Sequence, residues 1–304
     1  MSFAPIALFV YNRPEHTRRT ILALQKNELA TQSDLIIFSD GAKNEEVKNK
    51  VGEVRGYLKT ITGFKSVRIV ERSENFGLAK SIVGGVTEIV NQYGKIIVLE
   101  DDLVTAPYFL KYMNEALDLY EKEEKVISIH GYIYPVKQEL PETFFLRGAD
   151  CWGWATWKRG WDLFEQNGQK LLAELKEKNL THEFDFEGSY PYTQMLSGQI
   201  KGFNHSWAIL WYASAFLKNK LTLYPGKSLV SNSGFDNSGT HTGKITHFNT
   251  KISEKSLNVG NIDIFENKEA KEAVKKYFNS WPLKMITGFT RLKYYYKSFK
   301  KYVK

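Results

Sequence analysis

The chain has 304 residues, of which 42% are hydrophobic and 25% are charged. This composition is that of a globular protein and excludes disordered and collagen-like chains. The single cysteine, Cys151, excludes an intrachain disulfide and a cysteine-rich zinc site, which favours a reducing, cytoplasmic environment. No apolar run of about 18 residues and no secretion signal is visible, so we expect a soluble or peripheral protein.

The net charge of +8 is concentrated near the C-terminus. Residues 281–304 contain seven basic residues and no acidic residue, interleaved with aromatic and aliphatic side chains. Because the rest of the chain is nearly neutral, no nucleic-acid partner is expected. Two interpretations of this tail are open. Either it contacts an anionic membrane surface, on the inner face of the cytoplasmic membrane, or it is a helix that docks on the body and leaves its lysines in water.

The first hundred residues alternate between short apolar runs and helical patterns. Strands are predicted at 6–11, 35–39, 67–71 and 95–99, and helices at 15–26, 44–62 and 76–92. Continuous Ile/Val/Leu runs joined by helices predict an α/β fold, in which helices flank a mostly parallel sheet on both faces. In such sheets ligands bind beyond the carboxyl ends of the strands.

Beyond residue 103 the elements are shorter and more varied. Helices are predicted at 107–121, 169–178, 192–199 and 206–218, strands at 126–130, 144–146 and 221–224, a tryptophan-rich loop at 147–157, and a loop rich in small polar residues at 231–242. No repeat or low-complexity linker is present. We therefore expect one domain at 1–245, with halves 1–103 and 104–245, and a C-terminal extension at 246–304 that ends in the basic aromatic tail at 281–304.

Polar segments follow the predicted strands: 12–14, 40–41, 71–77 and 100–102. Their glycines match neither G-x-G-x-x-G nor G-x-x-x-x-G-K-[ST], which argues against a dinucleotide-binding fold or a P-loop. Glu100, Asp101 and Asp102 end an apolar strand and repel one another unless a cation or polar ligand compensates. One carboxylate plus substrate phosphates is a common way to hold Mg²⁺ or Mn²⁺. The alternative is that the triplet caps the next helix.

The sequence Glu100-Asp101-Asp102-Leu103, followed by Ala106-Pro107-Tyr108-Phe109, resembles the metal-binding motif of nucleotide-sugar glycosyltransferases of the Rossmann-like GT-A fold. It is most similar to the N-acetylglucosaminyltransferase I group and, more broadly, to bacterial family 2-like transferases found with surface-polysaccharide genes. The resemblance covers about residues 6–242. It implies a UDP-sugar donor such as UDP-GlcNAc, Mn²⁺ or Mg²⁺, inverting transfer to a free or lipid-linked glycan acceptor, and a nucleotide-binding first half and an acceptor-binding second half.

The resemblance also implies roles for single residues. Asp102 matches the residue that binds the metal, and Glu100 and Asp101 match contacts to the donor sugar and ribose. Arg13 and Asp40 match contacts to the nucleotide and its uracil ring. An ordinary surface arginine and a simple Asp-Gly turn are the alternatives for these two.

Two further segments, 75–81 and 147–157, resemble donor-site loops of the family, and the small, hydrogen-bonding residues of 231–242 suit a loop that folds over phosphates. In 75–81, Asn75 belongs to the part that closes over the nucleotide, and Lys80 either pairs with a phosphate or faces solvent. In 147–157, Trp154 lies beside the donor sugar, although at least one of the three tryptophans there is expected to serve packing alone. In 231–242, His241 is either a metal or diphosphate contact or an exposed loop residue.

One departure from the family concerns the catalytic base. The matching position is Ala208, which cannot take a proton. Either the alignment is shifted, or the base comes from elsewhere in the chain, and the candidates are then Asp150, Asp185 and His205, in that order. A non-catalytic carbohydrate-binding protein consequently stays open as an alternative. A sugar nucleotidyltransferase ranks lower, because residues 11–14 contain no glycine for a phosphate loop.

Overall fold

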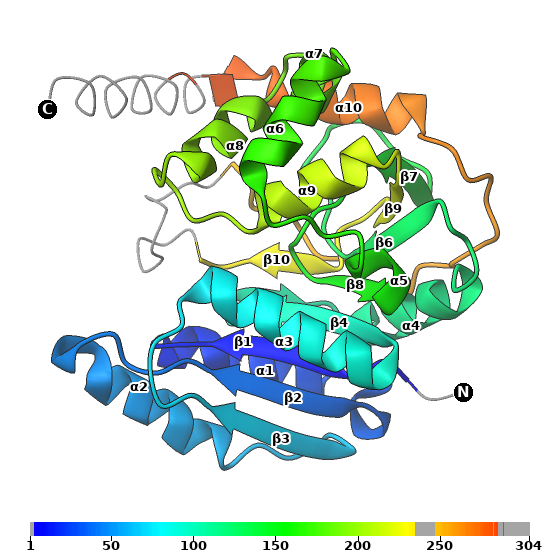
Figure 1. The fold of residues 1–304 in the computed structure, drawn as a ribbon. Coiled ribbons are helices and arrows are strands. Elements are labelled where there is room, and N and C mark those ends of the chain that lie inside the picture. Colours follow the sequence, from blue (N-terminus) through cyan, green and yellow to red (C-terminus); the bar gives the residue numbers. More distant parts are fainter. Residues whose placement is uncertain (1–2, 235–246, 282, 285–287, 289–304) are drawn as a thin grey trace, which may run out of the picture.

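A computed structural model gives the fold (Figure 1) and describes residues 3–234, 247–281, 283, 284 and 288. An eight-stranded sheet crosses the molecule in the order β3-β2-β1-β4-β8-β6-β9-β7. Its strands are β1 (Ile6–Val10), β2 (Asp34–Ser39), β3 (Ser66–Glu71), β4 (Lys95–Glu100), β6 (Val126–His130), β7 (Thr143–Arg147), β8 (Trp154–Trp157) and β9 (Leu221–Pro225). Beside it, β5 (Leu103–Thr105) and β10 (Val230–Asn232) form an antiparallel pair.

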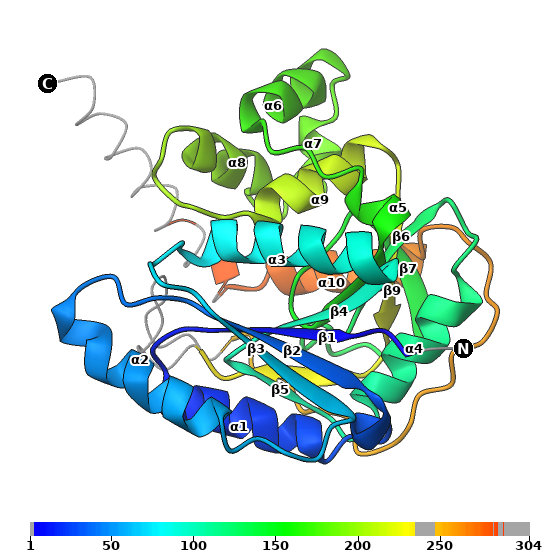
Figure 2. The ribbon, with the colours of Figure 1, turned by 60° about the horizontal axis from the view of Figure 1, so that its bottom comes forward.

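Helices cover both faces of the sheet (Figure 2). On one face lie α1 (Pro14–Gln25), α2 (Glu45–Leu58) and α4 (Phe109–Leu119). On the other lie α3 (Leu78–Tyr93), α5 (Lys158–Trp161), α9 (Ala208–Leu217) and α10 (Lys268–Phe278). Three more helices pack together beside α9: α6 (Gly168–Glu177), α7 (Thr181–Phe184) and α8 (Tyr192–Ile200). The α/β architecture predicted from the sequence is confirmed.

The first half of the sheet is parallel and follows the predicted order of strands. β1 pairs with β2 and β4, and β2 pairs with β3, all in parallel. Every residue of β1 is buried, because α1 and α3 cover its two faces. This double burial explains why the sequence of β1 is apolar throughout.

The second half of the sheet is mixed, and one prediction for it is wrong. Residues 154–157, expected within a loop, form β8, which lies antiparallel between β4 and β6. All four residues of this strand are buried. Trp154 and Trp157 face opposite sides of the sheet, as strand alternation requires. A four-residue strand without polar alternation gives no periodic signal in the sequence.

Trp154 belongs to the core. It is 1% exposed, and its ring lies 5.8 Å from that of Trp161, 5.7 Å from Trp207 and 5.8 Å from Trp211. The predicted place of Trp154 beside a donor sugar is thereby corrected, because its ring is enclosed by other rings. Trp152, two residues earlier, is half-buried and packs edge-to-face on Tyr132.

The C-terminal extension packs on the second half of the sheet. Asn267 caps α10 by accepting a hydrogen bond from the backbone N–H of Ala270 at 2.8 Å. One face of α10 buries Val274 and Phe278 against Phe144 and Leu146 of β7. Among the residues described, no helix is long and apolar enough to span a bilayer.

Two adjacent glycines of α3 allow a matched test of this packing. A Cβ on buried Gly85 would lie 2.7 Å from Cε1 of Phe9, whereas a Cβ on exposed Gly84 would meet nothing within 4 Å. We expect Gly85→Ala to lower the free energy of unfolding by about 1–3 kcal/mol through overpacking. Gly84→Ala should raise it by about 0.5–1 kcal/mol through helix propensity. Urea unfolding of both variants measures this, and equal effects would contradict the packing of α3 on β1.

Candidate functional site

Polar residues from distant parts of the chain meet at one edge of the sheet. The carboxyl ends of β1, β2 and β4 coincide there, since Val10 pairs with Ser39 and Phe9 pairs with Glu100. The segment before β8 comes to the same edge, because β8 runs antiparallel to β4 and Trp154 pairs with Val98. In Figure 1 the arrows of β1 and β2 point toward this edge.

The centre of the site is an acidic corner formed by Glu100, Asp101 and Asp102 with Arg13. The Nη1 of Arg13 donates to Oδ2 of Asp102 at 2.9 Å and to Oδ1 of Asp101 at 3.3 Å. The hydroxyl of Thr20 on α1 donates to the backbone carbonyl of Asp101 at 2.8 Å, which fixes the turn after β4. Among the described residues, Arg13 is the cation paired with Asp101 and Asp102, and Glu100 lies beside them, so the three carboxylates and Arg13 carry a surplus of negative charge when all are ionised.

The surplus negative charge and the burial of the corner raise the pKa values of two of its carboxyl groups. Burial, followed by the charges of Asp102 and Asp101, raises the pKa of Glu100 to about 8. Burial and the charge of Asp102 raise the pKa of Asp101 to about 7, against the opposing effect of Arg13. Without another cation, the corner therefore retains protons near neutral pH.

The acidic corner does not cap a helix. The next helix, α4, begins at Phe109, and its N-cap residue is Tyr108, which makes no side-chain capping bond. Between the triplet and α4 the chain forms β5. The capping alternative raised by the sequence is therefore wrong.

A second chain segment lies directly on Asp102. The backbone N–H and hydroxyl of Ser233, after β10, donate to the carbonyl of Asp102 at 2.8 and 3.0 Å. Gly234 approaches so closely that a Cβ there would lie 2.2 Å from Oδ2 of Asp102 and 3.1 Å from Nη2 of Arg13. The sequence marked this stretch as a loop of small polar residues at the donor site, but it did not indicate the contact with Asp102. His241 lies outside the described residues.

Asp40 anchors a loop. Its Oδ1 accepts hydrogen bonds from the backbone N–H groups of Gly41 at 3.0 Å and Phe76 at 2.8 Å. Its Oδ2 accepts from the N–H of Gly77 at 2.9 Å and from the side-chain amide of Asn75 at 3.2 Å. A carboxylate offers about four acceptor positions, and all are used here. The predicted contact of Asp40 with a uracil ring is therefore replaced by a role in holding residues 75–77.

Two cations lie over the ring of Phe76 in this anchored loop. The ammonium of exposed Lys80 and the guanidinium of Arg72 are each 4.3 Å from the ring centre. Asn75 also donates to the carbonyl of Gly41 at 2.8 Å. The loop is thus held to the end of β2 at several points and presents positive charge at the same edge as the acidic corner.

Of the three base candidates, Asp150 lies in the segment before β8, which reaches the same edge of the sheet as the acidic corner. Burial, together with the charges of Asp150, Glu100 and Asp102, raises the pKa of the Cys151 thiol. Cys151 directly follows Asp150 in the segment that reaches the carboxyl end of β4. The hydroxyl of Tyr134 donates to Oδ2 of Asp150 at 3.1 Å, and the N–H of Cys151 donates to Oδ1 at 2.9 Å.

The other two candidates have different surroundings. Asp185 accepts a hydrogen bond at 2.5 Å from the N–H of Thr193, which lies in the first turn of α8. Asp185 therefore caps this helix, although it lies seven residues before the first residue of α8. It also lines a cavity of about 340 Å³ between α6 and α8. His205 is exposed in the loop between α8 and α9.

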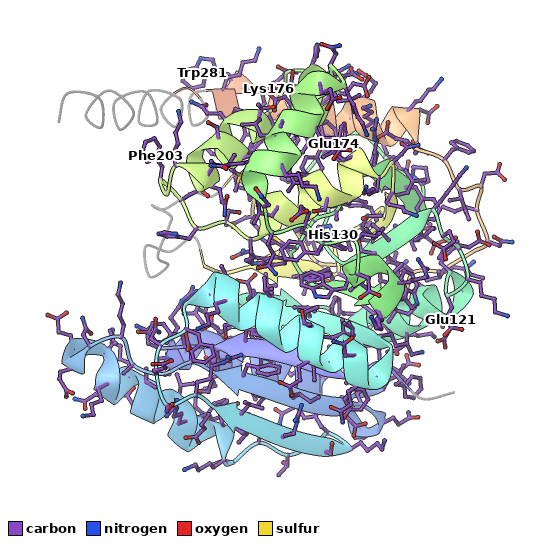
Figure 3. The ribbon with its side chains drawn as sticks, viewed as in Figure 1. Glu121, His130, Glu174, Lys176, Phe203 and Trp281 are labelled. Atoms are coloured by element: carbon purple, nitrogen blue, oxygen red, sulfur yellow. The ribbon has the colours of Figure 1, made fainter. Side chains whose placement is uncertain are left out.

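His130 is a site residue that the sequence did not indicate. It ends β6, is fully buried, and its Nε2 accepts a hydrogen bond from the N–H of Trp152 at 3.0 Å (Figure 3). An accepting Nε2 places the proton of the neutral ring on Nδ1. Burial lowers the pKa of His130, against the opposing charge of Asp150. The neutral imidazole thus fixes the segment from Asp150 to Gly153. In the sequence it was only the last residue of an apolar strand.

Within residues 3–234 and 247–284, apart from 282, no three His, Cys, Asp or Glu side chains are placed to hold one metal ion together. The donor set at the acidic corner nevertheless suits a hard divalent cation, since it consists of carboxylate oxygens with uncompensated charge. Such an ion would be held by one or two carboxylates together with oxygens of a substrate.

Comparison with known proteins gives limited information. No model of a known protein family matches the chain, and no curated protein sequence matches it. A mannosyltransferase from Pyrobaculum calidifontis, solved with GDP-mannose and Mn²⁺, is similar at 11% identity and a TM-score of 0.33, over 44% of this chain and 37% of that one. The chain thus spans little more than a third of that protein. A nucleotide-diphospho-sugar transferase from Desulfovibrio desulfuricans, itself described as putative, is similar at 11% identity and a TM-score of 0.34, over 55% and 69%. At these scores neither protein gives this chain an activity.

A Cβ at Gly234 tests the contact with the acidic corner. Gly234→Ala should push the carboxylate of Asp102 away from Arg13 and lower the free energy of unfolding by about 1–3 kcal/mol. Gly260→Ala is the control, because a Cβ there would meet nothing within 4 Å. Its effect should stay within about 0.5 kcal/mol. Urea unfolding measures both, and a neutral Gly234→Ala would show that Gly234 does not touch Asp102.

The raised pKa values predict how stability depends on pH. Because Glu100 and Asp101 hold protons more tightly folded than unfolded, the folded chain binds more protons between about pH 4 and pH 8. The free energy of unfolding of the metal-free chain should therefore fall as pH rises through this window, by on the order of a few kcal/mol. Glu100→Gln should flatten the slope. Urea unfolding in the presence of a chelator measures it, and identical slopes for the two proteins would contradict the shift.

Proposed function

We propose that the chain is a metal-dependent glycosyltransferase. It moves a hexosyl or N-acetylhexosaminyl group from a UDP-sugar, such as UDP-GlcNAc, to a glycan hydroxyl with inversion. The observation that carries this proposal is the acidic corner, where Glu100 lies beside Asp101 and Asp102, which pair with Arg13, at the carboxyl edge of parallel strands. A divalent cation with the diphosphate of a nucleotide supplies the charge that such a corner lacks.

Each residue of the corner has a role in this proposal. Asp102 would hold Mn²⁺ or Mg²⁺ jointly with diphosphate oxygens, and the ion when bound neutralises charge on the leaving group. Glu100 and Asp101 accept hydrogen bonds from hydroxyls of the donor. Arg13, which already lies against Asp101 and Asp102, orients these carboxylates and faces the phosphates. Lys80, exposed at the start of α3, supplies a further positive charge to them.

Asp150 is the proposed general base. Its carboxylate is held by the hydroxyl of Tyr134 and the N–H of Cys151, and its charge reaches the same segment as those of Glu100 and Asp102. From this place it can accept the proton of an acceptor hydroxyl that attacks the sugar from the side opposite the diphosphate. His130 keeps the segment after Asp150 in position through Trp152.

The acceptor is proposed to be a glycan in surface-polysaccharide or glycoconjugate synthesis, carried on a lipid at the inner face of the cytoplasmic membrane. A carbohydrate-binding protein without catalysis is the second candidate. It is supported by Ala208, which stands at the first position of α9 where the family resemblance places an acid.

Release of UDP from a panel of UDP-sugars, with Mn²⁺ and a glycan acceptor, tests the proposal. Asp102→Ala should lower kcat/KM by about 10²-fold or more, because it removes the metal ligand. Asp150→Asn should lower kcat by about 10²–10⁴-fold and leave UDP binding intact. Asp162→Asn, at an exposed carboxylate paired with Lys158, is the control and should leave activity unchanged.

Two results would contradict this assignment. Equal release of UDP by the native chain and Asp102→Ala would exclude metal-dependent transfer at this corner. Binding of the sugar nucleotide without any turnover, unaffected by Asp150→Asn, would favour the carbohydrate-binding alternative.

A further inference from the structure

Tyr134 lies between Asp150 and the C-terminal extension. Its hydroxyl donates to Oδ2 of Asp150 at 3.1 Å, and its ring packs edge-to-face on that of Phe278, with the ring centres 4.8 Å apart. Phe278 is the last residue of α10 and is 1% exposed. The ring of Tyr277, the residue before it, lies 5.9 Å from that of Tyr134. The side chain that holds the carboxylate of Asp150 is therefore itself held by α10.

Tyr192, the first residue of α8, belongs to the same group of rings. It packs edge-to-face on Phe278, with the ring centres 6.5 Å apart. Burial, followed by the charge of Asp150, raises the pKa of Tyr134 and of Tyr192, so both phenols stay neutral near pH 7 and keep their O–H donors. The charge of Asp150 also acts on titratable groups of its own segment, of β6 and the residues after it, of α9 and of β9: Cys151, His130, Tyr132, Tyr212 and Tyr224. Among the described side chains, Tyr134 is the one that donates a hydrogen bond to this carboxylate.

The turn between α7 and α8 has an uncommon backbone conformation. Phe186, Glu187 and Gly188 have φ angles of 54°, 54° and 77°, so three consecutive residues lie in the left-handed region. Residues with a Cβ adopt this region at a cost, and they stay there only where the surrounding structure fixes them. The ring of Phe186 packs edge-to-face on that of Phe278, with the centres 5.5 Å apart.

The polar side chains of α10 and its C-cap residue hold the same turn. Lys275 donates to Oε2 of Glu187 at 2.6 Å, and the ammonium of Lys271 lies 3.4 Å from Oε1 of the same carboxylate. The side-chain amide of Asn279 donates to the hydroxyl of Ser189 at 2.8 Å. The turn leads directly into α8. These contacts therefore join α10 to the start of α8, and Tyr134 contacts the end of α10.

We propose that α10 positions the carboxylate of Asp150, with Phe278 and Tyr134 as the two positioning residues. Phe278 restricts the ring of Tyr134 to one place, and the hydroxyl of Tyr134 then restricts the carboxylate of Asp150. Resting on the proposed function, this makes the C-terminal extension part of the catalytic unit, because a general base must lie within hydrogen-bond reach of the hydroxyl that it deprotonates. Neither positioning residue touches a substrate in this proposal.

Cys151 provides a test that does not need activity. It is the single cysteine of the chain, is half-buried, and donates its N–H to Oδ1 of Asp150 at 2.9 Å. Reaction of the native thiol with DTNB should be faster in Tyr134→Phe and in Phe278→Leu, because the segment after Asp150 opens more often. We expect an increase of about fivefold, the factor that corresponds to the loss of one hydrogen bond.

Phe145 and Tyr120 form a matched control pair. Phe145 is also 1% exposed, and its ring packs edge-to-face on that of Tyr120, with the centres 5.3 Å apart. The hydroxyl of Tyr120 donates to the carbonyl of Gly260 in the C-terminal extension at 3.0 Å. Phe145→Leu and Tyr120→Phe remove the same atoms from a different core cluster and should leave the reaction of Cys151 unchanged. Equal acceleration by both pairs would indicate a general loss of stability and overturn the proposal.

Transfer of the sugar tests the consequence for catalysis. Tyr134→Phe and Phe278→Leu should each lower kcat by about 3–10-fold and leave the KM for the UDP-sugar unchanged, because neither residue contacts the donor. In the Asp150→Asn background the same two substitutions should cause no further loss, since their effect passes through the carboxylate. Losses that multiply in the double variants would overturn the positioning role.

The two measurements separate this proposal from the proposed function. Faster reaction of Cys151 in the Tyr134 and Phe278 variants, without any transfer by the native chain, would support the positioning of Asp150 and contradict the transferase alone. Transfer by the native chain with an unchanged reaction of Cys151 in both variants would leave the transferase in place and overturn the role of α10.

Discussion

The site depends on one electrostatic constraint: three consecutive carboxylates lie together at the end of a buried strand, and two of them pair with one arginine. Arg13 pairs with Asp101 and Asp102, and the pKa values of Glu100 and Asp101 rise because burial and mutual repulsion oppose their ionisation. A protein that only needed stability would not keep this arrangement, since an unpaired buried charge costs more than an apolar side chain of the same size. The surplus charge is therefore best understood as the part of a binding site that a cationic ligand completes.

The rest of the edge is arranged so that this corner stays in place. Asp40 uses its four acceptor positions on residues 41 and 75–77, which ties the loop after β3 to the end of β2. His130 does the same for the segment before β8 by accepting the N–H of Trp152. Both are buried polar groups with specific partners, and such groups fix one conformation because no other satisfies them. The two loops of the site are thus anchored from β2 and β6, which are themselves buried strands.

The sequence predicted the elements whose pattern is set by their own residues. The apolar runs of β1 to β4, the helices between them and the polar strand ends could all be read from the sequence, because burial on both faces leaves a continuous apolar signal. β8 could not be predicted, since its four residues become a strand only between β4 and β6. The same holds for Asp40, whose partners in residues 75–77 lie more than 30 residues away, and for Gly234, which has no room for a Cβ because Asp102 lies against it. The residue type of Asp185 suggested a base, but its hydrogen bond to the N–H of Thr193 in α8 could not be read from the sequence.

Charge balance links the two halves of the edge in the proposed reaction. The corner with Arg13 carries a formal charge of about −2, and a divalent cation brings it to about zero. The diphosphate of a nucleotide sugar then adds two negative charges. The cation has already been neutralised by the carboxylates of the corner, so these two charges need another partner. Arg72 and Lys80 stand over Phe76 in the loop that Asp40 anchors, and together they carry the two positive charges that remain to be supplied. The hydrogen bonds of Asp40 would thus serve the proposed reaction, because they hold the cationic loop at the same edge as the acidic end of β4. In the sequence α3 separates this loop from β4.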